Sequence, residues 1–300
     1  MRADGVEIRR GVRRSSLAGL GWRRMAQWGS VYGPEWFVRL SPPLIGLVIC
    51  FLAPRPRRRV FKNLRLVRGV RDPWRDGLDV LRTFAVYASC LAETLSSSAM
   101  GARMPAVEAR GEEHIDEALR GGRGAVIVTA HTAGWEVVAS CLLRQRGVPV
   151  MIVEEAESDP ATASIQDAAR CAHGVAVVHV GDDPLSALAI VRHLRTGGIV
   201  ALQVDRVRKG MRAIAVTLFG VPEMVPIGPA KISMLTGAPI VPLFASRVGF
   251  RRYEVDVGAP VRLVRGASEA EVAGAMQGIA GALEGFVRRH PTQWFHFRGE

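Results

Sequence analysis

The chain has 300 residues, enough for one large α/β domain or two small ones, and 48% of them are hydrophobic, which is sufficient for a full core. Forty Lys and Arg residues against 28 Asp and Glu residues give a net charge of +12, which favours polyanionic partners such as anionic lipid headgroups, nucleic acid or an acidic carrier protein. No basic stretch is interleaved with aromatic residues as in a base-stacking surface, so the sequence argues against nucleic acid.

The N-terminal 30 residues are basic and contain no segment typical of a signal peptide, because the apolar run at 17–20 is too short. The chain has four cysteines without a C-x-x-C pair, so neither a zinc site nor a disulfide framework is expected. They are Cys50, Cys90, Cys141 and Cys171. We expect the protein to work in a reducing compartment.

An apolar segment at 36–53 is followed by an arginine cluster at 55–59. Its uninterrupted part, 44–53, has ten residues and follows Pro42-Pro43, whereas a transmembrane helix needs about 20. Arginines beside an apolar segment are suited to anionic headgroups at a membrane surface. The pattern predicts an interfacial anchor that does not span the membrane. A buried hairpin of core helices is the alternative.

Residues 60–104 are expected to be helical, since apolar residues recur there every three or four positions. These residues are Val80, Phe84, Tyr87, Leu91 and Leu95. Glu93 interrupts this apolar face. Either it points toward a substrate-binding site or it lies on a solvated face.

From about residue 106 onward, strand-like and helix-like segments alternate. Strands are predicted at 125–130, 149–153, 175–180, 199–204, 214–219, 240–245 and 253–257, and helices at 112–120, 135–146, 160–172, 184–196, 228–236 and 268–289. This alternation predicts an α/β fold with a mostly parallel or mixed central sheet and helices on both faces. We therefore divide the chain into a basic N-terminal region (1–104) and an α/β core (105–300).

The strand predicted at 125–130 ends on His131, and Glu136 follows five positions later. Residues five apart on one helix diverge by about 140°, so the two side chains meet only if His131 lies in a strand-to-helix turn. Glu136 would then hold one imidazole nitrogen and leave the other to take a proton from a substrate hydroxyl. The alternative is a chance pair in which Glu136 only favours the helix dipole.

A second polar cluster follows the strand predicted at 199–204, beginning with Asp205. The basic residues after it are Arg206, Arg208, Lys209 and Arg212. Such a cluster is suited to a phosphate or carboxylate, although a solvated basic loop is the alternative. The histidines other than His131 have no acid partner at comparable spacing, and we expect each to be structural. They are His114, His173, His179, His193, His290 and His296.

Together these motifs resemble the bacterial lipid A biosynthesis acyltransferases (lauroyl and myristoyl transferases) and the related phosphatidylinositol mannoside acyltransferases, over residues 30–298. The matching features are the apolar segment with its basic end, Asn63-Leu64-Arg65, Glu93, His131 through Trp135-Glu136, Asp205 with its basic loop, Phe219-Gly220, and the segments 236–242 and 291–297. Two positions depart from the family pattern. Ala133-Gly134 stands where Gly-Asn is common, and Gln203 replaces the first acid of a D-x-D motif.

The resemblance implies an enzyme at the cytoplasmic face of the inner membrane that moves an acyl group from acyl-ACP or acyl-CoA to a hydroxyl of a glycolipid or related polar lipid. It implies His131 as general base, Glu136 as its orienting partner and Asp205 as a further acid, with no metal and no cofactor. The expected partners are the thioester donor, acyl carrier protein included, and anionic lipids. Acyl transfer to a lysophospholipid, and lipid binding without catalysis, are the alternatives.

Overall fold

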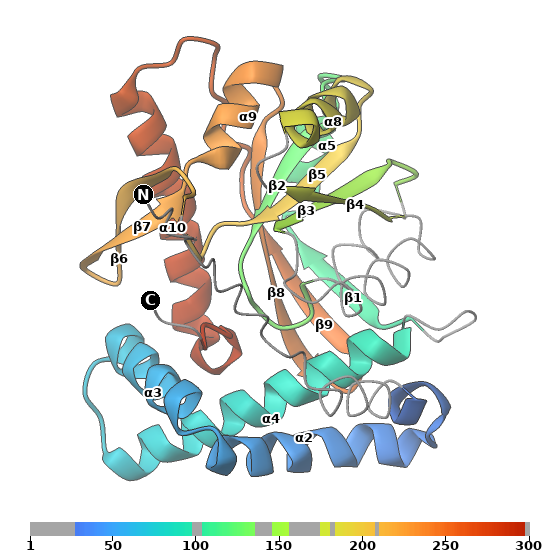
Figure 1. Ribbon diagram of the computed structural model, residues 1–300, viewed down its shortest axis with the longest axis vertical. Coiled ribbons are helices and arrows are strands. Elements are labelled where there is room, and N and C mark those ends of the chain that lie inside the picture. The colour runs from blue at the N-terminus through green and yellow to red at the C-terminus, as the bar shows by residue number, and fades with distance from the viewer. Residues whose placement is uncertain are drawn as a thin grey trace, which may run out of the picture.

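The computed structural model is built around a seven-stranded sheet with the order β1-β9-β8-β2-β5-β3-β4 (Figure 1). It describes residues 28–97, 104–135, 146–155, 175–180, 184–207 and 210–297. The strands are β1 (Ala106–Arg110), β2 (Ala125–Thr129), β3 (Val150–Glu155), β4 (Val175–Val180), β5 (Ile199–Gln203), β8 (Ile240–Gly249) and β9 (Arg252–Val257). β9 pairs antiparallel with β8, and the other neighbours pair in parallel. The predicted mixed α/β fold is confirmed.

The central strands are apolar throughout because both faces of the sheet are covered. All five residues of β2 are buried. One face packs on α8 (Pro184–Arg195), α9 (Gly228–Thr236) and α10 (Glu269–Arg289), and the other packs on α5 (Glu113–Leu119) and part of α4. The helices predicted at 135–146 and 160–172 lie almost wholly outside the described residues.

The strand predicted at 214–219 does not join this sheet. It forms β6 (Ala213–Leu218), which pairs with β7 (Val221–Pro226) in a separate antiparallel hairpin. The hairpin packs on α10, where the Gln277 side chain bonds both the N–H and the carbonyl of Thr217. Neither β7 nor β1 was predicted. β7 contains two prolines, which are rare within strands, so its sequence does not indicate a strand. In β1, two of the five residues are half-buried and the other three are exposed, so the apolar signal is weak.

Three helices form a base below the sheet: α2 (Glu35–Leu52), α3 (Pro54–Arg68) and α4 (Pro73–Ser97) (Figure 1). The helical stretch predicted at 60–104 is thus two helices, separated at Gly69, whose φ of 78° suits a helix end. α2 continues through Pro42 and Pro43 because it packs closely on α4. A Cβ on Gly46 would lie only 2.4 Å from the Phe84 carbonyl oxygen. The division of the chain at residue 104 stays a prediction.

Candidate active site

His131 and Asp205 lie just beyond the ends of two neighbouring parallel strands. Thr129 at the end of β2 is in register with Gln203 at the end of β5. Because the strands end at the same level, the side chains two residues further on meet, and His131 Nδ1 lies 2.8 Å from Asp205 Oδ1. Both residues are therefore at the carboxyl edge of the sheet, where ligands of such folds bind.

The Asp205 carboxylate has partners on both oxygens. Oδ1 contacts the His131 ring, and Oδ2 accepts hydrogen bonds from the His131 backbone N–H (3.2 Å) and the Trp294 indole N–H (3.0 Å). Burial alone raises the pKa of this carboxyl, but His131, Arg206 and His296 together outweigh burial and hold the pKa below its usual range. Asp205 is therefore charged at neutral pH.

The Asp205 carboxylate also fixes the tautomer of His131. A carboxylate only accepts hydrogen bonds, so Nδ1 carries the proton and Nε2 carries the lone pair. The His131 side chain is 26% exposed, and none of the described residues is hydrogen-bonded to Nε2. An imidazole held at one nitrogen by a carboxylate, with the other nitrogen open to a substrate, has the arrangement of a general base.

The C-terminal segment 291–297 completes the site from the far end of the chain. The Phe295 N–H donates to the His131 carbonyl (2.7 Å), and Trp294 forms a bridge with Thr132. The Arg206 guanidinium donates to the Phe295 carbonyl (2.6 Å), so one arginine of the basic loop lies against this segment. The turn that carries His131 is thus fixed by residues more than 150 positions away in sequence.

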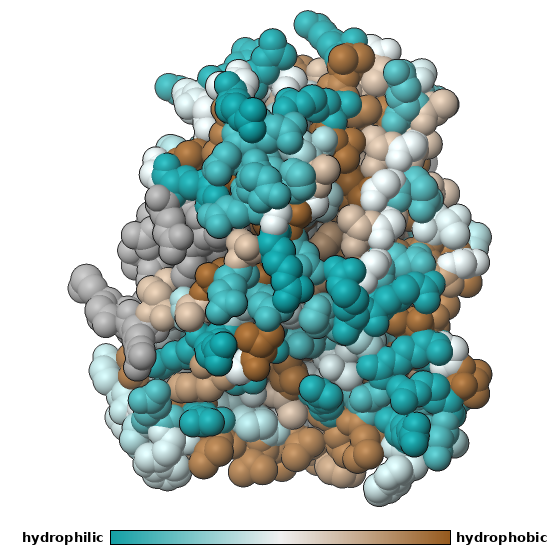
Figure 2. All heavy atoms as spheres, turned by 180° about the vertical axis from the view of Figure 1, so that it is seen from behind, coloured by the Kyte–Doolittle hydropathy of each residue, from teal (hydrophilic) through white to brown (hydrophobic). Residues whose placement is uncertain are grey.

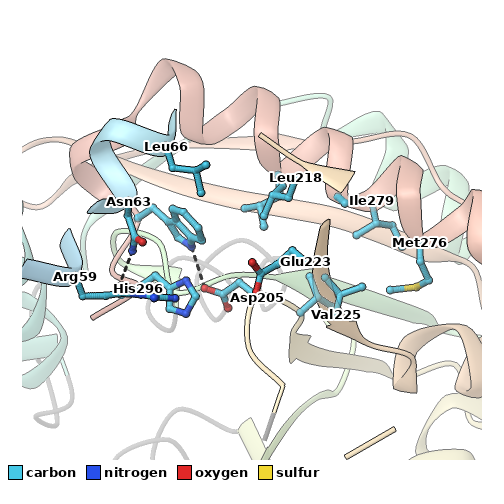
Figure 3. A pocket seen from close by; sticks show the side chains of 14 residues that line it. Arg59, Asn63, Leu66, Asp205, Leu218, Glu223, Val225, Met276, Ile279 and His296 are labelled. Atoms are coloured by element: carbon cyan, nitrogen blue, oxygen red, sulfur yellow. Dashed lines mark hydrogen bonds between the residues drawn. The ribbon is translucent and has the colours of Figure 1, made fainter. Parts of the chain in front are cut away.

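A largely apolar pocket opens beside Asp205, between α3, the β6–β7 hairpin and α10 (Figure 3). Its apolar lining residues are Leu66, Val204, Leu218, Val225, Met276, Ile279, Ala280, Leu283 and Trp294, and its polar ones are Arg59, Asn63, Asp205, Glu223 and His296. Arg59, Asn63 and His296 lie together at one end, and Met276 and Ile279 at the other. We call these the polar end and the apolar end of the pocket.

Sequence reasoning gave Trp294 no role and treated His296 as structural, yet both line this pocket. Burial lowers the pKa of His296 to about 4, so its ring is neutral at neutral pH. The one sequence signal for these residues was the match of the tail to the family pattern. Their spacing in the sequence gave no signal, because they are far from Asp205 along the chain and lie near it only in the folded protein.

Glu93 is buried, 4% exposed, at the centre of a polar network, so the interpretation as a solvated residue is wrong. Its Oε1 accepts two hydrogen bonds from the Arg247 guanidinium (2.9 and 2.7 Å), and its Oε2 accepts from the Arg251 N–H (3.1 Å) and the Tyr253 hydroxyl (2.7 Å). The Tyr253 ring in turn packs against Gly134 in the turn after His131. Glu93 lies behind this turn, and its predicted contact with substrate stays a prediction.

The remaining predicted site residues are Glu136, Arg208, Lys209 and Arg212. Glu136, Arg208 and Lys209 lie outside the described residues. Arg212 is exposed just before β6. In the part of the chain that the structure describes, no group of three or more His, Cys, Asp or Glu side chains is arranged to hold a metal ion. The expectation that neither a metal nor another cofactor takes part stays a prediction.

Comparison with known proteins agrees with the resemblance in the sequence. The family model described as "Bacterial lipid A biosynthesis acyltransferase" matches residues 28–299. The phosphatidylinositol mannoside acyltransferases of Mycobacterium tuberculosis strains CDC 1551 / Oshkosh and ATCC 25618 / H37Rv are 27% and 26% identical to the chain over 187 residues. Each match covers 61% of this chain and 56% of the relative, so the chain spans about half the length of the curated relatives it matches.

Proposed function

Because the chain belongs to the bacterial lipid A biosynthesis acyltransferase family, we propose that it transfers a fatty acyl group from an acyl thioester to a hydroxyl of a glycolipid or related polar lipid. The observation that carries this proposal is the His131–Asp205 pair, oriented as a general base beside an apolar pocket. Acyl-ACP and acyl-CoA are the candidate donors. The names of the relatives favour a glycolipid acceptor over a lysophospholipid.

The proposed reaction is a direct attack on the thioester. His131 Nε2 takes the proton of the acceptor hydroxyl, whose oxygen bonds to the carbonyl carbon. When the tetrahedral intermediate collapses, the C–S bond breaks and the imidazolium returns its proton to the leaving thiolate. Asp205 stabilises the imidazolium between these steps. Thr132 follows His131 directly in the sequence, but it is 1% exposed and accepts a bond from the Ala245 N–H, which disfavours a covalent intermediate on it.

The apolar pocket is proposed to hold the acyl tail. Its walls come from α10, the β6–β7 hairpin and Leu66 of α3, and they are continuous with the core on that face of the sheet. A tail in this pocket places the thioester at the polar end, next to Asp205 and thus close to His131. This placement gives one substrate a binding site and leaves the exposed side of His131 for the acceptor.

The base of the molecule is proposed to rest on the membrane. Of the described helices, α2 alone is long and apolar enough to cross a bilayer, with 18 residues and a mean hydropathy of 1.5. One stripe of α2 is buried on α4, which favours a helix lying flat on the surface over one that spans it. Its exposed apolar residues are Trp36, Phe37, Leu40, Leu44, Ile45, Val48, Ile49, Phe51 and Leu52. Apolar residues gather along the same base in Figure 2.

The test is acyl transfer by the purified full chain. Wild type, supplied with acyl-ACP or acyl-CoA and a membrane lipid extract, should consume the thioester and produce an acylated glycolipid that mass spectrometry identifies. His131→Ala should fold normally and lose this activity. Acylation of lysophospholipid alone would establish the alternative acceptor. Binding of lipid without thioester consumption would show a non-catalytic protein.

A further inference from the structure

Arg59 departs from the rest of the arginine cluster that the sequence assigns to the membrane surface. It lies on α3 one helical turn before Asn63, and both residues line the polar end of the pocket (Figure 3). The Asn63 amide donates to the His296 carbonyl (2.8 Å), which holds His296 in place beside Arg59. Arg55 and Arg58 are exposed, and Arg57 is half-buried but does not line the pocket.

Two polar atoms at this end of the pocket are buried without a hydrogen-bond partner: Arg59 Nε and His296 Nδ1. Buried polar atoms are rarely left unpaired in folded proteins, so each such atom needs an explanation. Both atoms belong to residues of one pocket wall. A ligand oxygen that binds between them would give each atom a hydrogen-bond partner. A cationic donor, and a neutral imidazole in the tautomer with the proton on Nδ1, suit an oxygen that carries or develops negative charge.

The position of these atoms relates them to the reacting bond. The pocket wall that carries Arg59 and His296 also carries Asp205, which is hydrogen-bonded to His131. If the acyl tail lies toward the apolar end and the attacking hydroxyl lies on His131 Nε2, the thioester carbonyl must lie between them, at the polar end. We propose that Arg59, with His296 beside it, binds the carbonyl oxygen of the acyl thioester and stabilises the oxyanion of the tetrahedral intermediate.

This inference rests on the proposed acyl transfer and adds to it the group that receives the charge. As the acceptor oxygen bonds to the carbonyl carbon, its proton moves to His131, and the C=O electron pair moves onto the oxygen held by Arg59. The pair then re-forms the carbonyl, the C–S bond breaks, and the thiolate takes the proton from His131. Asp205 is neutralised by the imidazolium at the intermediate, so the Arg59 charge remains available for the oxyanion.

The first experiment compares Arg59→Met, Arg59→Lys and the control Lys62→Met, an exposed cation on the same helix that does not line the pocket. Removal of a donor to an oxyanion lowers kcat by about a hundredfold to a thousandfold. We expect that loss in Arg59→Met, a smaller loss in Arg59→Lys, and KM values within a few-fold of wild type for both substrates. Lys62→Met should retain wild-type kcat. Thermal unfolding of each variant checks that the fold is intact.

The second experiment measures binding of two unreactive donor analogues. A thioether with CH₂ in place of the carbonyl should bind wild type and Arg59→Met equally. A fluoroketone that hydrates to a tetrahedral carbon should bind wild type more tightly and lose that advantage in Arg59→Met. A wild-type kcat in Arg59→Met would overturn the inference. A salt-dependent rise in KM without a change in kcat would also overturn it, and would indicate that Arg59 binds a phosphate of a substrate instead. Turnover by His131→Ala would instead overturn the proposed function itself.

Discussion

The contacts of Asp205 leave no room for a neutral substitute. Its Oδ2 accepts from two N–H groups, and its Oδ1 faces the N–H of the His131 ring. In Asp205→Asn, one orientation of the amide sets its NH₂ against the two N–H donors, and the other sets it against Nδ1 and forces the proton onto Nε2. We expect kcat to fall by about a thousandfold or more, with less effect on KM, in steady-state assays of this variant and wild type.

Glu136→Gln is the informative comparison for this substitution, because the sequence assigned the orienting role to Glu136. We expect it to cost less activity than Asp205→Asn, since Asp205 already occupies the Nδ1 side of the ring. The opposite ranking, with near wild-type kcat in Asp205→Asn, would return the orienting role to Glu136.

His296 gives the folded protein a pH dependence of its own. Its pKa falls from 6.5 to about 4 on folding, so between those values the unfolded chain binds a proton that the folded chain does not. The free energy of unfolding therefore keeps its full value, as far as His296 is concerned, above about pH 6.5, and it decreases as the pH falls toward 4. The loss is at most about 3.4 kcal/mol, and less because the ring is partly exposed. Chemical denaturation of His296→Gln should show a shallower decline over this range, and an identical decline would contradict the assignment.

At the scale of elements, α4 supports both halves of the site. Phe84 and Tyr87 pack against the rings of Phe295 and Phe297 in the C-terminal segment. One to two turns later, Glu93 holds Tyr253 behind the turn at Gly134. A single helix thus positions both the C-terminal segment that contacts His131 and the turn that follows His131.

Gly134 is where this support can be tested. It has φ of +67°, and an added Cβ would lie 2.2 Å from the Tyr253 ring, which is itself buried. Gly134→Ala must therefore strain the turn or displace the ring, and we expect a loss of about 1–3 kcal/mol in stability together with a lower kcat. Gly281→Ala is the matched control, because Gly281 lies in α10 with open space at its Cβ position. That control should gain about 0.5–1 kcal/mol. Equal behaviour of the two variants in thermal unfolding and activity would dissociate Gly134 from the site.

The sequence predicted elements better than it predicted their assembly. The β-branched runs that end at His131 and Asp205 are recognisable because buried parallel strands have no polar side. The same local reasoning missed β7. It also could not predict that β6 lies outside the main sheet, because the periodicity of a segment does not indicate which strand it pairs with. His296 and Trp294 were missed for the same reason. The hydrogen bond from the Phe295 N–H to the His131 carbonyl places their segment beside Asp205, and local sequence patterns do not predict such a long-range contact.

At the scale of the whole molecule, the site and the apolar base share one end. β8 runs parallel to β2 and β5, and its carboxyl end points toward α4 in Figure 1. The carboxyl edge that carries His131 is therefore directed at the base helices. Under the proposed function and membrane placement, a lipid acceptor whose hydrocarbon stays in the bilayer would present its headgroup to His131 without leaving the membrane. The net charge of +12 favours an anionic surface for this contact.

This arrangement predicts that membrane binding and chemistry are separable on α2. Leu44 and Val48 lie one turn apart, are 62% and 57% exposed, and do not line the pocket. Charges there would have to enter the interface, so Leu44→Asp/Val48→Asp should sediment with vesicles at least tenfold less than wild type. It should keep its kcat in detergent micelles, because the Glu93 network and the His131–Asp205 pair are untouched. Leu235→Asp on α9, with 57% exposure at a site away from the base, controls for the charge and should bind vesicles normally.

Binding of wild type should also weaken with salt and with removal of the anionic lipid, since headgroup attraction is screened beyond about 8 Å at physiological ionic strength. If the double variant binds as wild type does, α2 is not the surface that rests on the membrane, and the acceptor must reach His131 by another route.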